Sequence, residues 1–118
     1  MSDQTAQKYL DAAPEPQRNT LLTMWSTVRR LLPDAEVTLS YGVPTLKVGG
    51  KGVAGVAHYA KHCRYLPMSG PVTATLAEQL RDHRTSKGAV MMPIDQPLSE
   101  DLLVALVDAR LAELGRTR

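Results

Sequence analysis

The chain has 118 residues, the size of one domain with a single core, so we expect residues 1–118 to form one domain. The net charge is only +2 and there is no dense basic run, which argues against nucleic-acid binding. No apolar run approaches the ~20 residues that cross a bilayer, and MSDQTAQKYL lacks a signal-peptide core, so we expect a cytoplasmic protein that does not enter membranes.

The first predicted elements are two helices. The stretch TAQKYLDAA is compatible with a short helix that ends before Pro14. From Pro16 to Leu32, apolar residues recur at the spacing of one helix face, which predicts a long amphipathic helix with Pro16 in its first turn. The face of this helix consists of Leu21, Trp25, Val28 and Leu32.

Between Ala35 and Met68 the pattern changes to short β-compatible runs that Gly and Pro separate. These runs are EVTLSY, TLKVGG, KGVAGVAHY and CRYLPM. VGGKG predicts a tight hairpin turn. The residues YAKH predict another reversal; with a two-residue turn, His58 faces Cys63 across the hairpin, whereas one residue more or less would place them on opposite faces.

The last third of the chain predicts helix, strand and helix. SGPVTATLAEQLRDHR returns to helical spacing, and KGAVMMPI is a short strand that ends at Pro93. LSEDLLVALVDARLAELG predicts a closing helix with Ser99 as N-cap and Gly115 at the C-terminal cap. Because helices and strands are segregated, we expect an α+β fold: a small antiparallel meander of about four to five strands packed against three or four helices in two layers.

The charge is concentrated in the middle of the chain. Residues 44–90 contain seven basic residues and two acidic ones, a net charge of +5, whereas residues 1–43 and 91–118 carry −1 and −2. Such an arrangement favours a small anionic ligand or an acidic protein surface as partner; the alternative is a set of solvated surface lysines.

The stretch SYGVPTLKV is the first candidate for a site. Gly42 and Pro44 predict a rigid, kinked link between two strands, and Pro44 cannot donate a hydrogen bond to the sheet. The kink either only joins the strands or directs Tyr41 and Lys47 into a cleft. In the second interpretation Tyr41, Pro44 and Lys47 contact a ligand.

The stretch HYAKHC is the second candidate, because it contains two histidines and the single cysteine. His58 and Cys63 facing each other could bind a soft metal such as zinc, but no spacing supplies further ligands. His62 and Cys63 are neighbours on a strand and point to opposite faces, so they do not form a Cys–His catalytic pair. We therefore predict no catalytic residues and no metal ligands, and an enzymatic function is not favoured.

The third candidate is RTSKGAVMMP. Thr85, Ser86, Lys87 and the amide of Gly88 form a cluster of hydrogen-bond donors that leads into a strand. This cluster could hold an anion, or it could be an ordinary loop that leaves a helix.

The ordered set of these motifs resembles the YdhG-like superfamily, a group of small bacterial domains of largely unknown function. The shared elements are a YG-x-P turn, a Gly-Lys hairpin, a KH turn, an SKG strand start, a P-I-x-x-P-L linker and a closing helix with an arginine. In this sequence they are Tyr41, Gly42 and Pro44; Gly50 and Lys51; Lys61 and His62; Ser86, Lys87 and Gly88; Pro93, Pro97 and Leu98; and Arg110. The resemblance implies an α+β fold over nearly the whole chain.

One branch of that superfamily is described as a frataxin-like intracellular iron chaperone, so the resemblance offers iron binding as an alternative function. Ferrous and ferric ions delivered by such a chaperone prefer oxygen ligands, so the protein needs a surface rich in Asp and Glu. The helix from Pro16 to Leu32 has no Asp or Glu, and the middle of the chain is basic, so this sequence departs from that pattern.

The leading hypothesis is a non-enzymatic domain without a cofactor that binds a small anionic ligand or an acidic partner in a pocket on its sheet. The predicted ligand-binding residues are Tyr41, Pro44, Lys47, His58, Lys61, His62 and Lys87. Iron binding is the first alternative. The second is a protein-interaction module without a small ligand, for which an exposed strand edge could form a homodimer.

Overall fold

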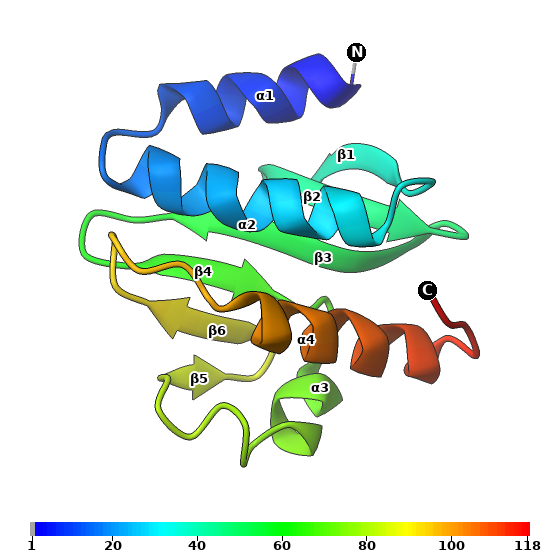
Figure 1. The fold of residues 1–118 in the computed structure, drawn as a ribbon. Coiled ribbons are helices and arrows are strands. Elements are labelled where there is room, and N and C mark those ends of the chain that lie inside the picture. Colours follow the sequence, from blue (N-terminus) through cyan, green and yellow to red (C-terminus); the bar gives the residue numbers. More distant parts are fainter. Residues whose placement is uncertain (1) are drawn as a thin grey trace.

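A computed structural model describes the backbone of residues 2–118 and the side chains of residues 4–118. Figure 1 shows the elements in chain order. The helices are α1 (Ser2–Ala12), α2 (Gln17–Leu31), α3 (Gly70–Thr75) and α4 (Glu100–Glu113). The strands are β1 (Glu36–Ser40), β2 (Val43–Val48), β3 (Lys51–His58), β4 (Cys63–Leu66), β5 (Thr85–Ser86) and β6 (Ala89–Met92).

The strands form one antiparallel sheet in the order β1-β2-β3-β4-β6-β5. This arrangement confirms the predicted α+β class. The sheet has six strands where about four to five were expected, because Thr85 and Ser86 add the two-residue strand β5 at one edge. The meander holds from β1 to β4, and β6 then pairs with β4 so that β5 lies outermost.

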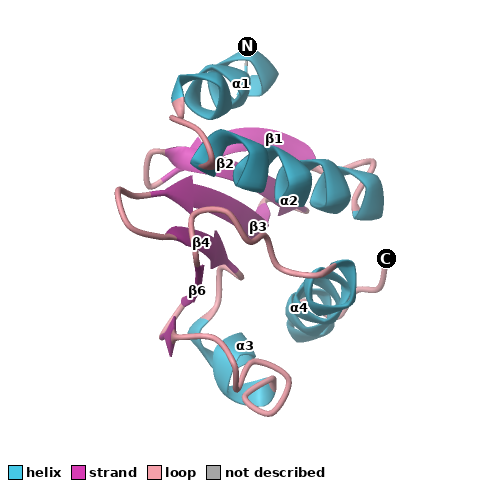
Figure 2. Cartoon of the chain, turned by 60° about the vertical axis from the view of Figure 1, so that its left-hand side comes forward, coloured by secondary structure: helices cyan, strands magenta, loops and turns pink. Residues whose placement is uncertain are grey.

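The two long helices cover the same face of the sheet (Figure 2). All four residues of the predicted stripe on α2 and its C-cap are buried, as expected: Leu21, Trp25, Val28 and Leu32. On β4, Cys63 and Tyr65 belong to the core beneath the helices, while Arg64 and Leu66 are partly exposed. Alternation along this strand therefore separates the core from the side chains that reach solvent.

Both predicted hairpins are confirmed. Gly49 and Gly50 have positive φ angles of 58° and 81° and form the turn between the paired residues Val48 and Lys51. In the second hairpin His58 lies opposite Cys63, and the Tyr59 N–H donates a hydrogen bond of 2.9 Å to the His62 carbonyl.

The closing helix also has the predicted ends. The Ser99 hydroxyl accepts a hydrogen bond from the Leu102 N–H at 3.2 Å. Gly115 has a φ of 70°, and the Arg116 N–H donates to the Leu111 carbonyl at 2.9 Å, which completes a C-terminal cap.

The middle helix is shorter than its sequence spacing predicts. α3 ends at Thr75, although Leu76 and Leu80 remain buried and the Leu80 N–H still donates to the Leu76 carbonyl at 3.0 Å. Two β-branched threonines weaken the helix, and the Thr73 hydroxyl donates to the Gly70 carbonyl at 2.9 Å. The apolar spacing was therefore right, but the segment continues as turns.

None of the helices in residues 2–118 combines the length and the apolar character that crossing a bilayer requires.

Candidate ligand-binding site

The predicted ligand-binding residues do not gather around one hollow. Tyr41 and Lys87 line one surface hollow, Lys61 and His62 line a second, and Lys47 lines a third. The antiparallel topology explains part of this separation. The start of β4 lies beside the end of β6, so the turn before β4 is at the opposite end of the strand from the residues that precede β6.

The first of these, which we name the Lys87 hollow, has a volume of about 490 Å³. Its lining includes residues from the end of β4, the start of α3 and the C-terminal half of α4. Figure 1 shows where these three elements lie. It is lined by Ser40, Tyr41, Gly52, Leu66, Met68, Ser69, Gly70, Lys87, Gly88 and Arg110.

Two residues of the Lys87 hollow have unusual backbone geometry. Tyr41 and Met68 have positive φ angles of 55° and 67°, and they are the non-glycine residues with this geometry in the described part of the chain. A bulky residue in this region is strained by about 1–3 kcal/mol, and such strain is found mostly at functional sites. Tyr41 and Gly42 together form the two-residue turn between β1 and β2, where both central residues need positive φ.

The Tyr41 turn also leaves its aromatic ring in solvent. The Tyr41 side chain is 93% exposed at the rim of the hollow. An aromatic ring that is held on a rigid turn and makes little contact with its own protein is available to a ligand.

The cations of the Lys87 hollow come from two different elements. Lys87 precedes β6, and its aliphatic stem lies against Gly70, where a Cβ atom would overlap the Lys87 Cγ. Arg110 is on α4, and its side chain is only 15% exposed. Its Nε donates to the Gly52 carbonyl at 2.9 Å and its Nη1 to Glu113 Oε1 at 3.1 Å. Arg110 is therefore held in place, while Lys87 forms no ion pair within residues 4–118.

Apolar and neutral polar groups complete the Lys87 hollow. Met68 packs over Gly55, where a side chain would collide with the Met68 methyl group. Leu66 adds a second apolar side chain. Ser69 is the N-cap residue of α3 but its hydroxyl makes no capping hydrogen bond. The hollow thus offers two cations, hydroxyl groups and a small apolar wall.

Pro44 lies elsewhere than the sequence suggested. It is a buried residue inside β2, opposite Leu39 of β1, and the link between the strands is Tyr41–Gly42. The pairing of β2 with β3 begins one residue later, at Thr45, because proline has no N–H to donate. The link predicted over Gly42–Pro44 therefore lies at Tyr41–Gly42, and Pro44 is already in β2, where it pairs with β1 but not with β3.

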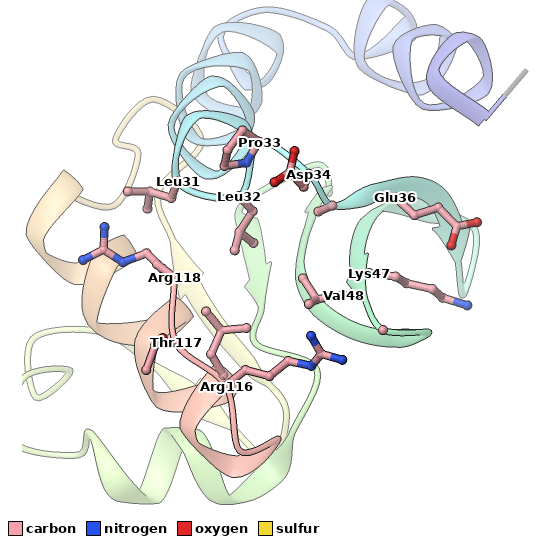
Figure 3. Close-up of a pocket in the computed structure, with 13 residues that line it drawn as sticks. Leu31, Leu32, Pro33, Asp34, Glu36, Lys47, Val48, Arg116, Thr117 and Arg118 are labelled. Atoms are coloured by element: carbon pink, nitrogen blue, oxygen red, sulfur yellow. The ribbon is translucent and has the colours of Figure 1, made fainter.

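Lys47 is too far along β2 to share a cleft with Tyr41, since six strand residues span roughly 20 Å. It lines a hollow of about 420 Å³ between the end of α2 and the C-terminal residues (Figure 3). In Figure 3 Lys47 and Glu36 extend to the same side, away from Thr117 and Arg118. Asp34 and Glu36 lie beside Lys47 in this lining, and Arg118 is already paired with Asp108 at 2.7 Å, so most of its positive charge is offset.

His58 is occupied by a contact with α1. Its ring lies 5.1 Å from that of Tyr9, and its backbone N–H donates to the Tyr9 hydroxyl at 3.1 Å. Its partner across the hairpin, Cys63, is buried, and burial raises the pKa of the Cys63 thiol to about 11. Cys63 therefore stays protonated at neutral pH and is a packing residue in the core.

Lys61 and His62 line the second hollow, which we name the Arg84 hollow. Its volume is about 410 Å³. It is lined by Lys61, His62, Asp82, His83, Arg84, Met91, Met92 and Pro93. Among the described residues, no three or more His, Cys, Asp or Glu side chains lie together in a way that could hold a metal ion.

Sequence reasoning found two of the residues at the Lys87 hollow and missed others. Arg110 was noted as a shared motif residue, but nothing in its spacing connects it to Lys87. Met68 and Ser69 also line the hollow. The backbone there turns through the positive φ of Met68, a conformation that the chemistry of these side chains does not predict. A sequence signal for this was the MSG segment between a strand and a helix.

Comparison with known proteins supports the fold. No family model matches the sequence, and no curated protein matches it significantly. The structure is similar to the crystal structure of a protein from the DUF1801 family, YdhG of Bacillus subtilis, with a TM-score of 0.85 and 14% sequence identity. The match covers 95% of this chain and 92% of that chain. The chain therefore has a YdhG-like fold, as its motifs indicated.

Proposed function

We propose that this YdhG-like domain binds a small anionic molecule in the Lys87 hollow. The observation that supports this most strongly is the coincidence of two strained residues, Tyr41 and Met68, with two cations, Lys87 and Arg110, in one hollow. These residues come from four distant parts of the sequence. Three of them, all except Met68, also belong to the motifs that resemble the YdhG-like superfamily.

Each part of the hollow has a distinct role in the proposed complex. Lys87 and Arg110 bind a carboxylate or phosphate group, because a charged hydrogen bond is worth about 1.5–3 kcal/mol. Leu66 and Met68 contact the apolar part of the ligand. Tyr41 lies over the ligand from the rim, and its ring contributes contact area at little cost in side-chain entropy.

The proposal is tested by a thermal-shift screen of anionic metabolites, followed by calorimetry of each hit with the wild type and Lys87→Ala. We expect binding to weaken roughly ten- to a hundredfold, which corresponds to the loss of one charged hydrogen bond. Lys47→Ala is the matched control, because it removes a partly exposed cation from a different hollow, and it should leave the affinity unchanged. Hits that bind Lys87→Ala as tightly as the wild type would rule out the Lys87 hollow.

A further inference from the structure

We propose that the Arg84 hollow is a second, separate binding site, for a tetrahedral oxyanion such as phosphate, sulfate or the phosphate group of a small phosphomonoester. The hollow lies where the β3–β4 turn meets the end of β6 and the segment between α3 and β5 (Figure 1). It does not share a residue with the Lys87 hollow.

The Arg84 hollow has more cations than acidic groups, and its cations form no ion pairs with the described residues. Lys61 and Arg84 form no ion pair within residues 4–118, and both are exposed. Asp82 is the acidic side chain in the lining, so the cations outnumber it. Arg64 lies next to the hollow and adds a third positive charge.

Two side chains, those of Tyr59 and Arg64, are arranged around His62. Its ring stacks on the Tyr59 ring at a centroid distance of 4.8 Å and an angle of 15°. The Arg64 guanidinium lies over the same Tyr59 ring at 4.8 Å, and Arg64 Nε donates to His62 Nε2 at 3.1 Å. These contacts hold both side chains in fixed positions before any ligand arrives, which lowers the entropy cost of binding.

The hydrogen bond from Arg64 also fixes the role of His62. Since Nε2 accepts, the neutral ring carries its proton on Nδ1, which is therefore a donor. A group of N–H donors from Lys61, His62 and Arg84 around one small hollow matches the acceptor oxygens of a tetrahedral anion. Met91, Met92 and Pro93 also line the hollow and carry no charge, which leaves Asp82 as the carboxylate of the lining.

The site should also couple anion binding to the uptake of a proton. The groups that face His62 are Tyr59, Lys61, Arg64, Asp82, His83 and Arg84. Burial lowers the pKa of His62 below its usual value, and the charges of Arg64 and Arg84 lower it further. A bound anion offsets these charges and raises the pKa of His62, so by linkage the anion binds more tightly at a pH low enough to protonate His62. The proton is taken up at Nε2, which then no longer accepts the hydrogen bond from Arg64 Nε.

The first experiment is a titration of the protein with sodium sulfate and sodium phosphate, followed by amide NMR at constant ionic strength in chloride. We expect saturable shifts at residues 59–64, 82–84 and 91–93. Arg84→Ala and Lys61→Ala should each weaken sulfate binding at least fivefold. In Lys87→Ala the shifts at residues 59–64, 82–84 and 91–93 should saturate at the same sulfate concentration as in the wild type, so failure of this site is distinguishable from failure of the Lys87 hollow.

The second experiment measures sulfate affinity at pH about 5.5 and about 8, because sulfate keeps its double charge over this range. The wild type should bind at least threefold more tightly at the lower pH, and His62→Gln should lose this dependence. Phenyl phosphate distinguishes the two sources of the oxyanion. Tighter binding than phosphate assigns the site to phosphomonoesters, and equal binding assigns it to the free oxyanion.

Absence of saturable shifts, or shifts of equal size in Arg84→Ala and the wild type, would overturn the proposal. A His62→Gln variant that keeps the full pH dependence would overturn the assignment of proton uptake to His62.

Discussion

The hydroxyl of Tyr65 is a buried polar group without a hydrogen-bond partner among the described residues. Such a group costs about 1–3 kcal/mol of stability, because it leaves water without finding another partner. We therefore expect Tyr65→Phe to raise the free energy of unfolding by about 1 kcal/mol, as measured by urea denaturation.

Tyr9→Phe is the matched control for this prediction. It removes a hydroxyl that accepts a hydrogen bond from the His58 N–H, so it should lower the free energy of unfolding by about 1 kcal/mol. If Tyr65→Phe also lowers stability, the Tyr65 hydroxyl has a partner in solution, such as a buried water molecule.

The strained turn at Tyr41 leads to a second prediction. Tyr41→Asn creates an Asn-Gly turn, the pair that suits two positive φ angles best, and the exposed ring contributes no packing that would be lost. We expect the free energy of unfolding to rise by about 0.5–1 kcal/mol. Ligand affinity at the Lys87 hollow should fall in the same variant.

Tyr59→Asn is the comparison for Tyr41→Asn. The Tyr59 ring contacts His62 and Arg64, so its loss should reduce stability rather than raise it. A lower melting temperature for Tyr41→Asn than for the wild type would contradict the prediction. It would mean that the contacts of the Tyr41 ring stabilise the protein by more than the strain at the turn destabilises it.

Helix α4 provides a prediction for a whole element, since its N-terminus depends on one hydroxyl. Ser99→Ala removes the hydrogen bond to the Leu102 N–H and should cost about 1 kcal/mol of unfolding free energy. Ser69→Ala at the start of α3 is the control, because that serine makes no capping hydrogen bond, and it should change stability little. Equal losses in the two variants would contradict the assigned cap.

The elements that sequence predicted well are those in which several local signals agree. α2 has an apolar stripe, α4 has a stripe and both caps, and the two hairpins have turn residues between alternating runs. α3 is shorter than predicted, and β5 was not predicted. In α3 the Thr73 hydroxyl donates to the Gly70 carbonyl and competes with the helical pattern, and β5 is too short to have a pattern at all.

The candidate site was harder to predict than the fold for a geometric reason. Local patterns place a residue on an element, but the order of strands decides which elements meet. Lys87 and His62 both lie in the basic segment, yet β4 separates them. Arg110 reaches the Lys87 hollow because it is anchored to the Gly52 carbonyl, a contact between residues 58 positions apart.

For the molecule as a whole, we expect the free energy of unfolding to fall at alkaline pH, because the buried Cys63 thiol then loses its proton more easily in the unfolded state. Its folded-state pKa of about 11 lies above the unfolded value of about 9. The folded state therefore binds the thiol proton more tightly, and this stabilisation is complete below pH 9 and is lost as the pH rises from about 9 to about 11. Burial also raises the pKa of Tyr9 and Tyr65, which adds to the loss at higher pH.

The contribution of Cys63 is isolated by comparing the wild type with Cys63→Ala in urea at pH 8, 9 and 10. The variant lacks one buried sulfur, so it should be less stable at pH 8, and the difference between the two proteins should shrink as the pH rises. Curves that remain parallel over this range would contradict the assignment to the thiol.

The four-residue strand β4 alternates between core and solvent, with Cys63 and Tyr65 inward and Arg64 and Leu66 outward. Inserting or deleting one residue there would turn the Arg64 guanidinium into the apolar interior and expel the Tyr65 ring. Proteins that share this architecture are therefore expected to differ in length within the flanking loops, and to keep the spacing between the two hollows constant.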